Sequence, residues 1–127
     1  EEARAELGAV GDRPLCVVAH NGFAGELEQI LAKQDVDPAR YQIVTLTNSE
    51  EGRNIFPLAD YARGIDFLVG GAGYNLFYEA RYFRTPAHHI PLERSGDEQR
   101  WRLETNYDYS FSENGADYVA RRIVDLL

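Results

Sequence analysis

The run Gly70-Gly71-Ala72-Gly73-Tyr74-Asn75 joins an apolar segment to a segment with helical apolar spacing. Glycines let a ligand come close to the backbone, and the free amides and positive end of a helix favour phosphate. The turn is therefore a candidate phosphate site, and a tight turn needed only for packing is the alternative. The dinucleotide-binding pattern G-x-G-x-x-G is not met, because Leu76 stands at the third glycine position.

Two groups of acidic and amide side chains follow this turn. Glu79 lies on the same expected helix, where its carboxylate could accept hydrogen bonds from both hydroxyls of a ribose whose phosphates sit at the helix start. Asp97-Glu98-Gln99 follows a polar loop and could hold sugar hydroxyls. The alternatives are an exposed helix glutamate for Glu79 and a helix start capped by Asp97.

The remaining reactive side chains carry weaker signals. Cys16 lies in an apolar run, where burial would raise its pKa and make it a poor nucleophile. His88 and His89 are neighbours on an expected strand, so they should point to opposite faces and not share a metal. No metal-ligand spacing is present. We therefore expect no metal and no cofactor.

Apolar periodicity predicts strands that alternate with helices along the whole chain. We expect strands at residues 15–20, 42–47, 65–69 and 87–90, with 107–111 as a last strand or an ordered loop. Helices are expected at 23–31, 58–63, 74–84, 99–103 and 114–127, the last one facing inward through Ala116, Val119, Ala120, Ile123 and Leu127. This order predicts a three-layer, Rossmann-like α/β domain with a mainly parallel sheet and helices on both faces. Ligands of such sheets bind beyond the carboxyl ends of the strands.

Composition limits the function classes. The 127 residues fit one domain, with 1–13, which begins with a charged, Ala-rich stretch, expected as a linker or helix from a preceding domain. Because the sequence starts at Glu1 and contains no Met, we expect it to be part of a longer protein. The formal net charge of −8 argues against nucleic acid as a partner. No apolar run is long enough for an integral membrane segment. A single cysteine favours a reducing compartment, and we expect a cytoplasmic protein.

The order and spacing of four pieces resemble the donor-binding signature of GT-B fold glycosyltransferases, closest to MurG-like family 28 enzymes and UDP-glycosyltransferases. The pieces are residues 70–79, Thr85-Pro86, Ile90-Pro91 and 97–99. Two positions depart from that signature: Gly71 replaces a histidine common in UDP-glycosyltransferases, and the loop 20–25 is poorer in glycine than in MurG-like enzymes.

The resemblance implies that the chain is the carboxyl-terminal, donor-binding half of such an enzyme, which binds a nucleotide-sugar, expected to be UDP-linked. It would act on an acceptor held by an amino-terminal domain and be inactive alone. The implied contacts are Asn21, Gly22, Gly71, Ala72, Gly73 and Tyr74 for the diphosphate, Glu79 for the ribose, Ile55 and Phe56 for the base, and Asn75, Glu98 and Gln99 for the sugar.

Three other functions stay open at this stage. A nucleotide-sugar hydrolase or 2-epimerase would share the fold, because fold alone does not set function. A non-catalytic half-enzyme that acts only with a partner subunit is a second possibility. A plain dinucleotide-binding domain is the third, although no suitable acid follows the glycine turn at about 20 residues.

Overall fold

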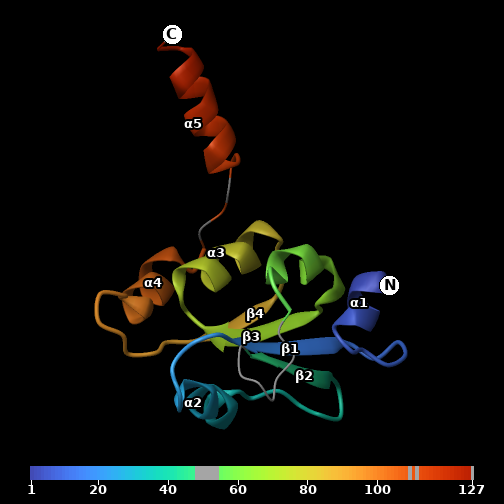
Figure 1. Ribbon diagram of the computed structural model, residues 1–127. Coiled ribbons are helices and arrows are strands. Elements are labelled where there is room, and N and C mark those ends of the chain that lie inside the picture. The colour runs from blue at the N-terminus through green and yellow to red at the C-terminus, as the bar shows by residue number, and fades with distance from the viewer. Residues whose placement is uncertain (48–54, 109, 111, 127) are drawn as a thin grey trace.

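The chain folds around one all-parallel sheet of four strands, and the computed structural model describes residues 1–47, 55–108, 110 and 112–126 (Figure 1). The strands are β1 (Leu15–His20), β2 (Gln42–Thr47), β3 (Phe67–Gly71) and β4 (Ala87–Ile90), in the order β2-β1-β3-β4. The predicted α/β class is therefore confirmed. Because all three pairings, β1 with β2, β1 with β3 and β3 with β4, are parallel, all four strands end at the same edge of the sheet.

Helices cover both faces of this sheet (Figure 1). One face carries α2 (Glu26–Lys33), and the other carries α3 (Tyr74–Tyr82) and the 3₁₀ helix η1 (Leu58–Gly64). The connections from β1 to β2 and from β2 to β3 therefore run over opposite faces. This reversal makes the edge between β1 and β3 the topological switch point, where open parallel sheets bind ligands.

Strand β1 supplies both cores because its side chains alternate between the two faces. Leu15, Val17 and Ala19 pack with α3 and η1 residues, and Cys16 and Val18 pack with Ile30 of α2. All six residues of β1 are buried, as expected for a central parallel strand. Burial raises the pKa of the Cys16 thiol to about 11, which agrees with the prediction of an unreactive core cysteine.

Strand β3 runs further than the sequence pattern predicts. The pattern places the strand at residues 65–69, whereas the strand begins at Phe67, and Gly70 and Gly71 continue the pairing with β1 and β4. A Cβ at Gly70 would lie 2.4 Å from Leu76 Cδ2 and 2.8 Å from the Ala19 carbonyl oxygen. Gly70 thus serves close packing of α3 on the sheet.

Helix α2 begins later than predicted. Gly25 adopts a left-handed conformation with φ of 85°, and the helix starts at Glu26. Phe23, expected on the inward face of this helix, lies before it and is 73% exposed. Because the backbone at Gly25 is left-handed, a right-handed helix cannot continue through it, and Phe23 does not share a helix with Leu27.

The first residues of the chain pack on the domain. Helix α1 (Glu2–Glu6) contacts η1, and Leu7 after it is fully buried in the core. Arg4 pairs with Asp66, whose carboxylate also accepts the Leu15 amide at 2.7 Å. These contacts fasten α1 to the start of the sheet.

The last two helices are α4 (Gln99–Asn106) and α5 (Gly115–Val124). Asn114 caps α5 by accepting the Ala116 amide at 2.8 Å. The predicted inward face is wrong for the described residues, because every residue from 112 to 126 is exposed and α5 projects from the body (Figure 1). Leu127 of that face lies outside the described residues, as do Tyr109 and Phe111 of the segment 107–111.

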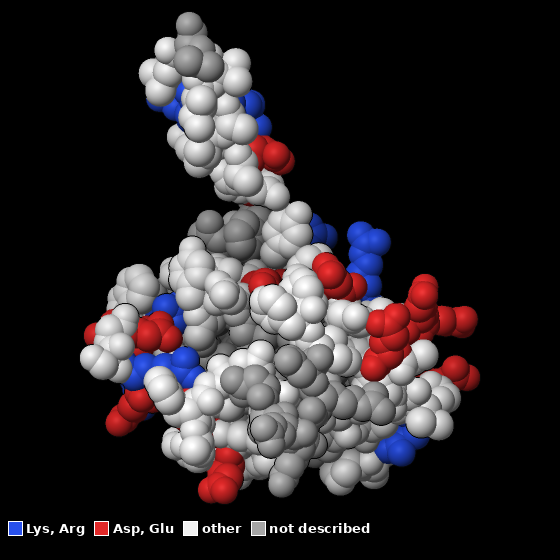
Figure 2. Space-filling view, viewed as in Figure 1, with Lys and Arg blue, Asp and Glu red and all other residues white. Residues whose placement is uncertain are grey.

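Charged side chains are unevenly spread over the surface. Figure 2 shows acidic side chains gathered at the end of the body that carries α1, while basic side chains on this face stand singly or in small groups. In the described parts of the chain, no helix is long and apolar enough to cross a membrane.

Candidate functional site

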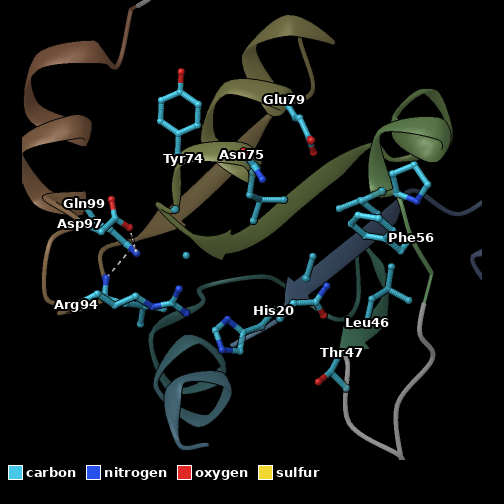
Figure 3. Close-up of a pocket in the computed structure, with 18 of the residues that line it drawn as sticks. His20, Leu46, Thr47, Phe56, Tyr74, Asn75, Glu79, Arg94, Asp97 and Gln99 are labelled. Carbon is cyan, nitrogen blue, oxygen red and sulfur yellow. Dashed lines mark hydrogen bonds between the residues drawn. The ribbon is translucent and has the colours of Figure 1, made fainter. Parts of the chain in front are cut away.

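A cavity of about 450 Å³ opens at the carboxyl edge of the sheet (Figure 3). The segments at or after the ends of β1, β2 and β3, and the loop beyond β4, all contribute to its wall. Nine of the twelve residues predicted to bind a donor line it: Asn21, Ile55, Phe56, Gly71, Gly73, Tyr74, Asn75, Glu79 and Gln99. The fold therefore brings together residues as far apart in the sequence as Asn21 and Gln99, a separation of 78 positions.

The start of α3 forms one wall of the cavity. Gly73 is the N-cap residue and no side chain caps the helix, so the first amides have no helical acceptor. A Cβ added at Gly73 would meet nothing within 4 Å. The backbone at Gly73 and Tyr74 is therefore open to a ligand, and the amides and the helix dipole favour an anion there.

Ala72 belongs to the same turn but lies outside the cavity. It is fully buried, its amide donates to Gln99 Oε1 at 3.0 Å, and its carbonyl accepts from Arg102 Nη1 at 2.5 Å. Both its amide and its carbonyl thus have partners within the protein, and the diphosphate contact implied for Ala72 stays a prediction. Ala72 fixes the shape of the turn.

Glu79 lies beyond the first turn of α3 and lines the cavity with its side chain (Figure 3). It is half-buried, and desolvation raises the pKa of its carboxyl above the usual value. Within the described parts of the chain, no residue donates a hydrogen bond to this carboxylate or pairs with it. An unpaired carboxylate in a cavity is a ready acceptor for ligand hydroxyls.

Ile55 and Phe56 give the cavity an apolar wall, and Figure 3 shows Phe56 on the side of the cavity away from Tyr74. Phe56 is 80% exposed, so its ring is available to a ligand. Leu46 and Leu58 extend this wall. A flat aromatic or heterocyclic group could pack here, because stacking needs only an apolar face.

The predicted sugar-binding residues are placed differently from one another. Asn75 lines the cavity with an exposed side chain, whereas Glu98 is exposed outside it. Gln99 lines the cavity but is 2% exposed, and its Oε1 accepts the amides of Ala72 and Leu92 while its Nε2 donates to Asp97. Gln99 thus holds two loops together, with only one amide hydrogen left for a ligand.

Asp97 lines the cavity one position before the residue predicted for the sugar. Its carboxylate accepts from Gln99 and from Arg102, and these contacts lower its pKa against the opposing effect of desolvation. The helix cap suggested for Asp97 is not formed, because Glu98 occupies the N-cap position without a side-chain cap. A count of residues along the sequence does not fix which of these two acids turns inward.

The loop after β1 holds Asn21 at the cavity and Gly22 beside it. A Cβ at Gly22 would lie 2.4 Å from Arg94 Nη2 and 2.7 Å from His20 Cε1. Gly22 is therefore required for close packing, and only its neighbour Asn21 lines the cavity.

A cluster that the sequence does not reveal lies beside the cavity, which His20 and Arg94 line and Glu26 does not. Glu26 is 7% exposed and binds Arg94 through two hydrogen bonds, Nε to Oε1 at 2.8 Å and Nη2 to Oε2 at 2.5 Å. His20 Nε2 lies 3.0 Å from Glu26 Oε2, although the geometry does not satisfy a hydrogen bond. Arg94 and Glu26 are 68 positions apart, so no local motif signals their pairing.

The histidine neighbours behave as predicted from strand geometry. His89 is buried, with Nδ1 3.1 Å from the Gly71 carbonyl oxygen, and His88 is exposed. Burial lowers the pKa of His89 to about 4, so the ring is neutral at physiological pH. The described residues contain no group of three His, Cys, Asp or Glu side chains placed to hold a metal ion.

No protein-family model, curated protein or solved structure matches the chain.

Proposed function

We propose that this chain is the donor-binding domain of a glycosyltransferase and that its cavity holds a nucleoside diphosphate sugar, expected to be UDP-linked. The observation that carries the proposal is that three features line one cavity. They are the start of α3 without a side-chain cap, the Glu79 carboxylate, which has no partner among the described residues, and the apolar wall at Ile55 and Phe56. The family resemblance of residues 70–99 supports the same assignment.

The three features match the three parts of the ligand in chemical kind. A nucleoside diphosphate carries an anionic diphosphate, a ribose with two hydroxyls and a flat base. The amides after Gly73 suit the diphosphate, the Glu79 carboxylate suits the ribose hydroxyls, and Phe56 with Ile55 suits the base. Asn75 at the cavity wall is left to contact the sugar.

In this proposal the domain contributes binding and stabilisation of the departing diphosphate. Amides preorganised at a helix start stabilise developing negative charge without reorganising. The acceptor and the base that activates it would lie on an amino-terminal partner domain. The chain alone is then expected to bind the donor weakly and to transfer no sugar. We expect the protein to be in the cytoplasm, where its single buried thiol at Cys16 stays reduced.

Titration calorimetry with UDP tests the proposal on wild type, Glu79→Ala and Glu104→Ala. Glu104 is an exposed carboxylate on α4 outside the cavity, so its substitution controls for a change of net charge. We expect Glu79→Ala to lose about tenfold to a hundredfold in affinity, because hydrogen bonds to a charged group are removed. Equal affinities in all three proteins, or no binding of UDP by wild type, would overturn the assignment.

A further inference from the structure

Arg94 stands out among the cations because it lines the cavity while its charge is held in a fixed place. Two of its nitrogens, Nε and Nη2, bind the carboxylate of Glu26. Glu26 is nearly fully buried and also accepts the Phe23 amide at 3.0 Å. A guanidinium anchored by a buried bidentate pair loses little freedom when it binds a further group.

The third nitrogen of the guanidinium, Nη1, remains available. No described residue accepts a hydrogen bond from it, and the Arg94 side chain is 27% exposed. Figure 3 shows Arg94 reaching from the side of Asp97 across the cavity toward His20, below the start of α3. The cavity therefore has hydrogen-bond donors on two sides, the α3 amides and Arg94.

An anion between these two sets of donors would meet both. The amides at the start of α3 contribute a partial positive charge, and Nη1 contributes charge-assisted hydrogen bonds. Glu26 offsets part of the charge of Arg94. Arg94 therefore contributes to anion binding mainly through hydrogen bonds in a fixed direction, and less through its net charge. A group with two linked phosphates offers one phosphate to each set of donors, whereas a single phosphate offers only one.

We propose that Arg94 binds the distal phosphate of a nucleoside diphosphate, and that Glu26 is the positioning residue that aims it. The inference rests on the proposed function and deepens it, because it makes this pair the reason that the cavity prefers a diphosphate to a monophosphate. The tight fit of Gly22 against Arg94 Nη2 and Glu26 Oε2 keeps the pair in place from the side of the β1 loop.

The test compares the affinities for UDP, UMP and inorganic pyrophosphate in wild type and Arg94→Gln. We expect Arg94→Gln to weaken UDP binding about tenfold to a hundredfold and to leave UMP binding nearly unchanged. Arg94→Gln leaves the Glu26 carboxylate buried without its partner and could fail to fold. The double variant Glu26→Gln/Arg94→Gln removes both charges, and it should show the same loss of preference for UDP over UMP.

Glu26→Gln alone tests positioning. It keeps the Arg94 charge but weakens its anchor, so the ratio of UDP to UMP affinity should fall part of the way toward that of Arg94→Gln. A merely structural role would lower both affinities together and leave the ratio unchanged, which would contradict the role given to Glu26.

The outcomes separate this inference from the proposed function. UDP binding that is unaffected by Arg94→Gln, or UDP and UMP affinities that fall equally in the folded double variant, would overturn the inference and leave nucleotide binding intact. Pyrophosphate binding that depends on Arg94, without UDP binding, would support the anion site and overturn the nucleotide assignment. Absence of binding for all three ligands in wild type would overturn both.

Discussion

At the scale of single residues, Glu79 links binding to stability. Desolvation raises the pKa of its carboxyl, which means that the folded chain disfavours the ionised form. An acid whose pKa is higher in the folded state lowers the stability as the pH rises through that pKa. The ionised carboxylate of Glu79, which the proposed ribose contact requires, therefore destabilises the fold at neutral pH.

This conflict predicts that Glu79→Gln is more thermostable than wild type at pH 7 and binds UDP less well. Below about pH 4, where the unfolded chain also holds the proton, the two proteins should unfold at nearly the same temperature. Thermal unfolding followed by circular dichroism across this pH range measures the difference. A wild type that is the more stable protein at pH 7 would show that Glu79 has a stabilising partner.

At the scale of elements, the turn from β3 to α3 contains two glycines in different surroundings, one closely packed and one open. Gly70 is closed in by Leu76 and the Ala19 carbonyl, whereas the Cβ position of Gly73 is open. The first glycine serves the packing of α3 on the sheet. The second leaves backbone exposed at the cavity.

Matched alanine substitutions separate the role of Gly70 in packing from the role of Gly73 in ligand binding. Gly70→Ala should lower the free energy of unfolding by about 1–3 kcal/mol, because the added methyl group overpacks the turn. Gly73→Ala should change it by less than about 1 kcal/mol, yet weaken UDP binding, because its methyl group fills the space in front of the α3 amides. Denaturant unfolding and calorimetry on both variants give the two quantities. A destabilised Gly73→Ala with normal affinity would contradict this division.

The sequence predicted the elements well where the side chains themselves carry the pattern. The apolar runs at 15–20, 42–47 and 87–90 coincide with β1, β2 and β4. The end of β3 was missed because Gly70 and Gly71 have no side chains to show a strand, and their pairing comes from the neighbouring strands. The start of α2 was missed because the periodicity that begins at Phe23 crosses Gly25.

Residue spacing by itself suggested a common ligand only for residues that are close in sequence, whereas Asn21, Ile55 and Phe56 were implied by the family resemblance. The glycine turn and Glu79 share one helix, so their spacing alone suggests a common ligand. The Glu26–Arg94 pair and the bonds of Gln99 to Ala72 and Leu92 depend on how distant loops meet. Sequence spacing carries no information about such contacts.

At the scale of the whole molecule, the hydrogen-bond donors of the cavity must hold an anion although the net charge of the chain is negative. The chain carries a formal net charge of −8, which disfavours an anion at long range. The start of α3 and Arg94 are therefore the groups that would hold a diphosphate. At the same scale, α5 extends from the body with its apolar side chains exposed.

The position of α5 predicts that its apolar residues do not support the fold of this chain. Ile123→Ala should change the free energy of unfolding by less than about 0.5 kcal/mol, as for other surface sites. The same substitution at buried Ile30 of α2 should cost about 2–5 kcal/mol. Denaturant unfolding of both variants makes the comparison. A similar loss from Ile123→Ala would show that α5 packs on the body in solution.

Binding of a nucleoside diphosphate at the start of α3 is tested most directly by titrating the isotopically labelled chain with UDP and following the amide chemical shifts. We expect the largest shifts at the amides of Tyr74, Asn75 and Leu76 at the start of α3, with further shifts at Ile55 and Phe56. Saturation with UDP that leaves the α3 amides unshifted, or shifts confined to surfaces outside the cavity, would contradict this expectation.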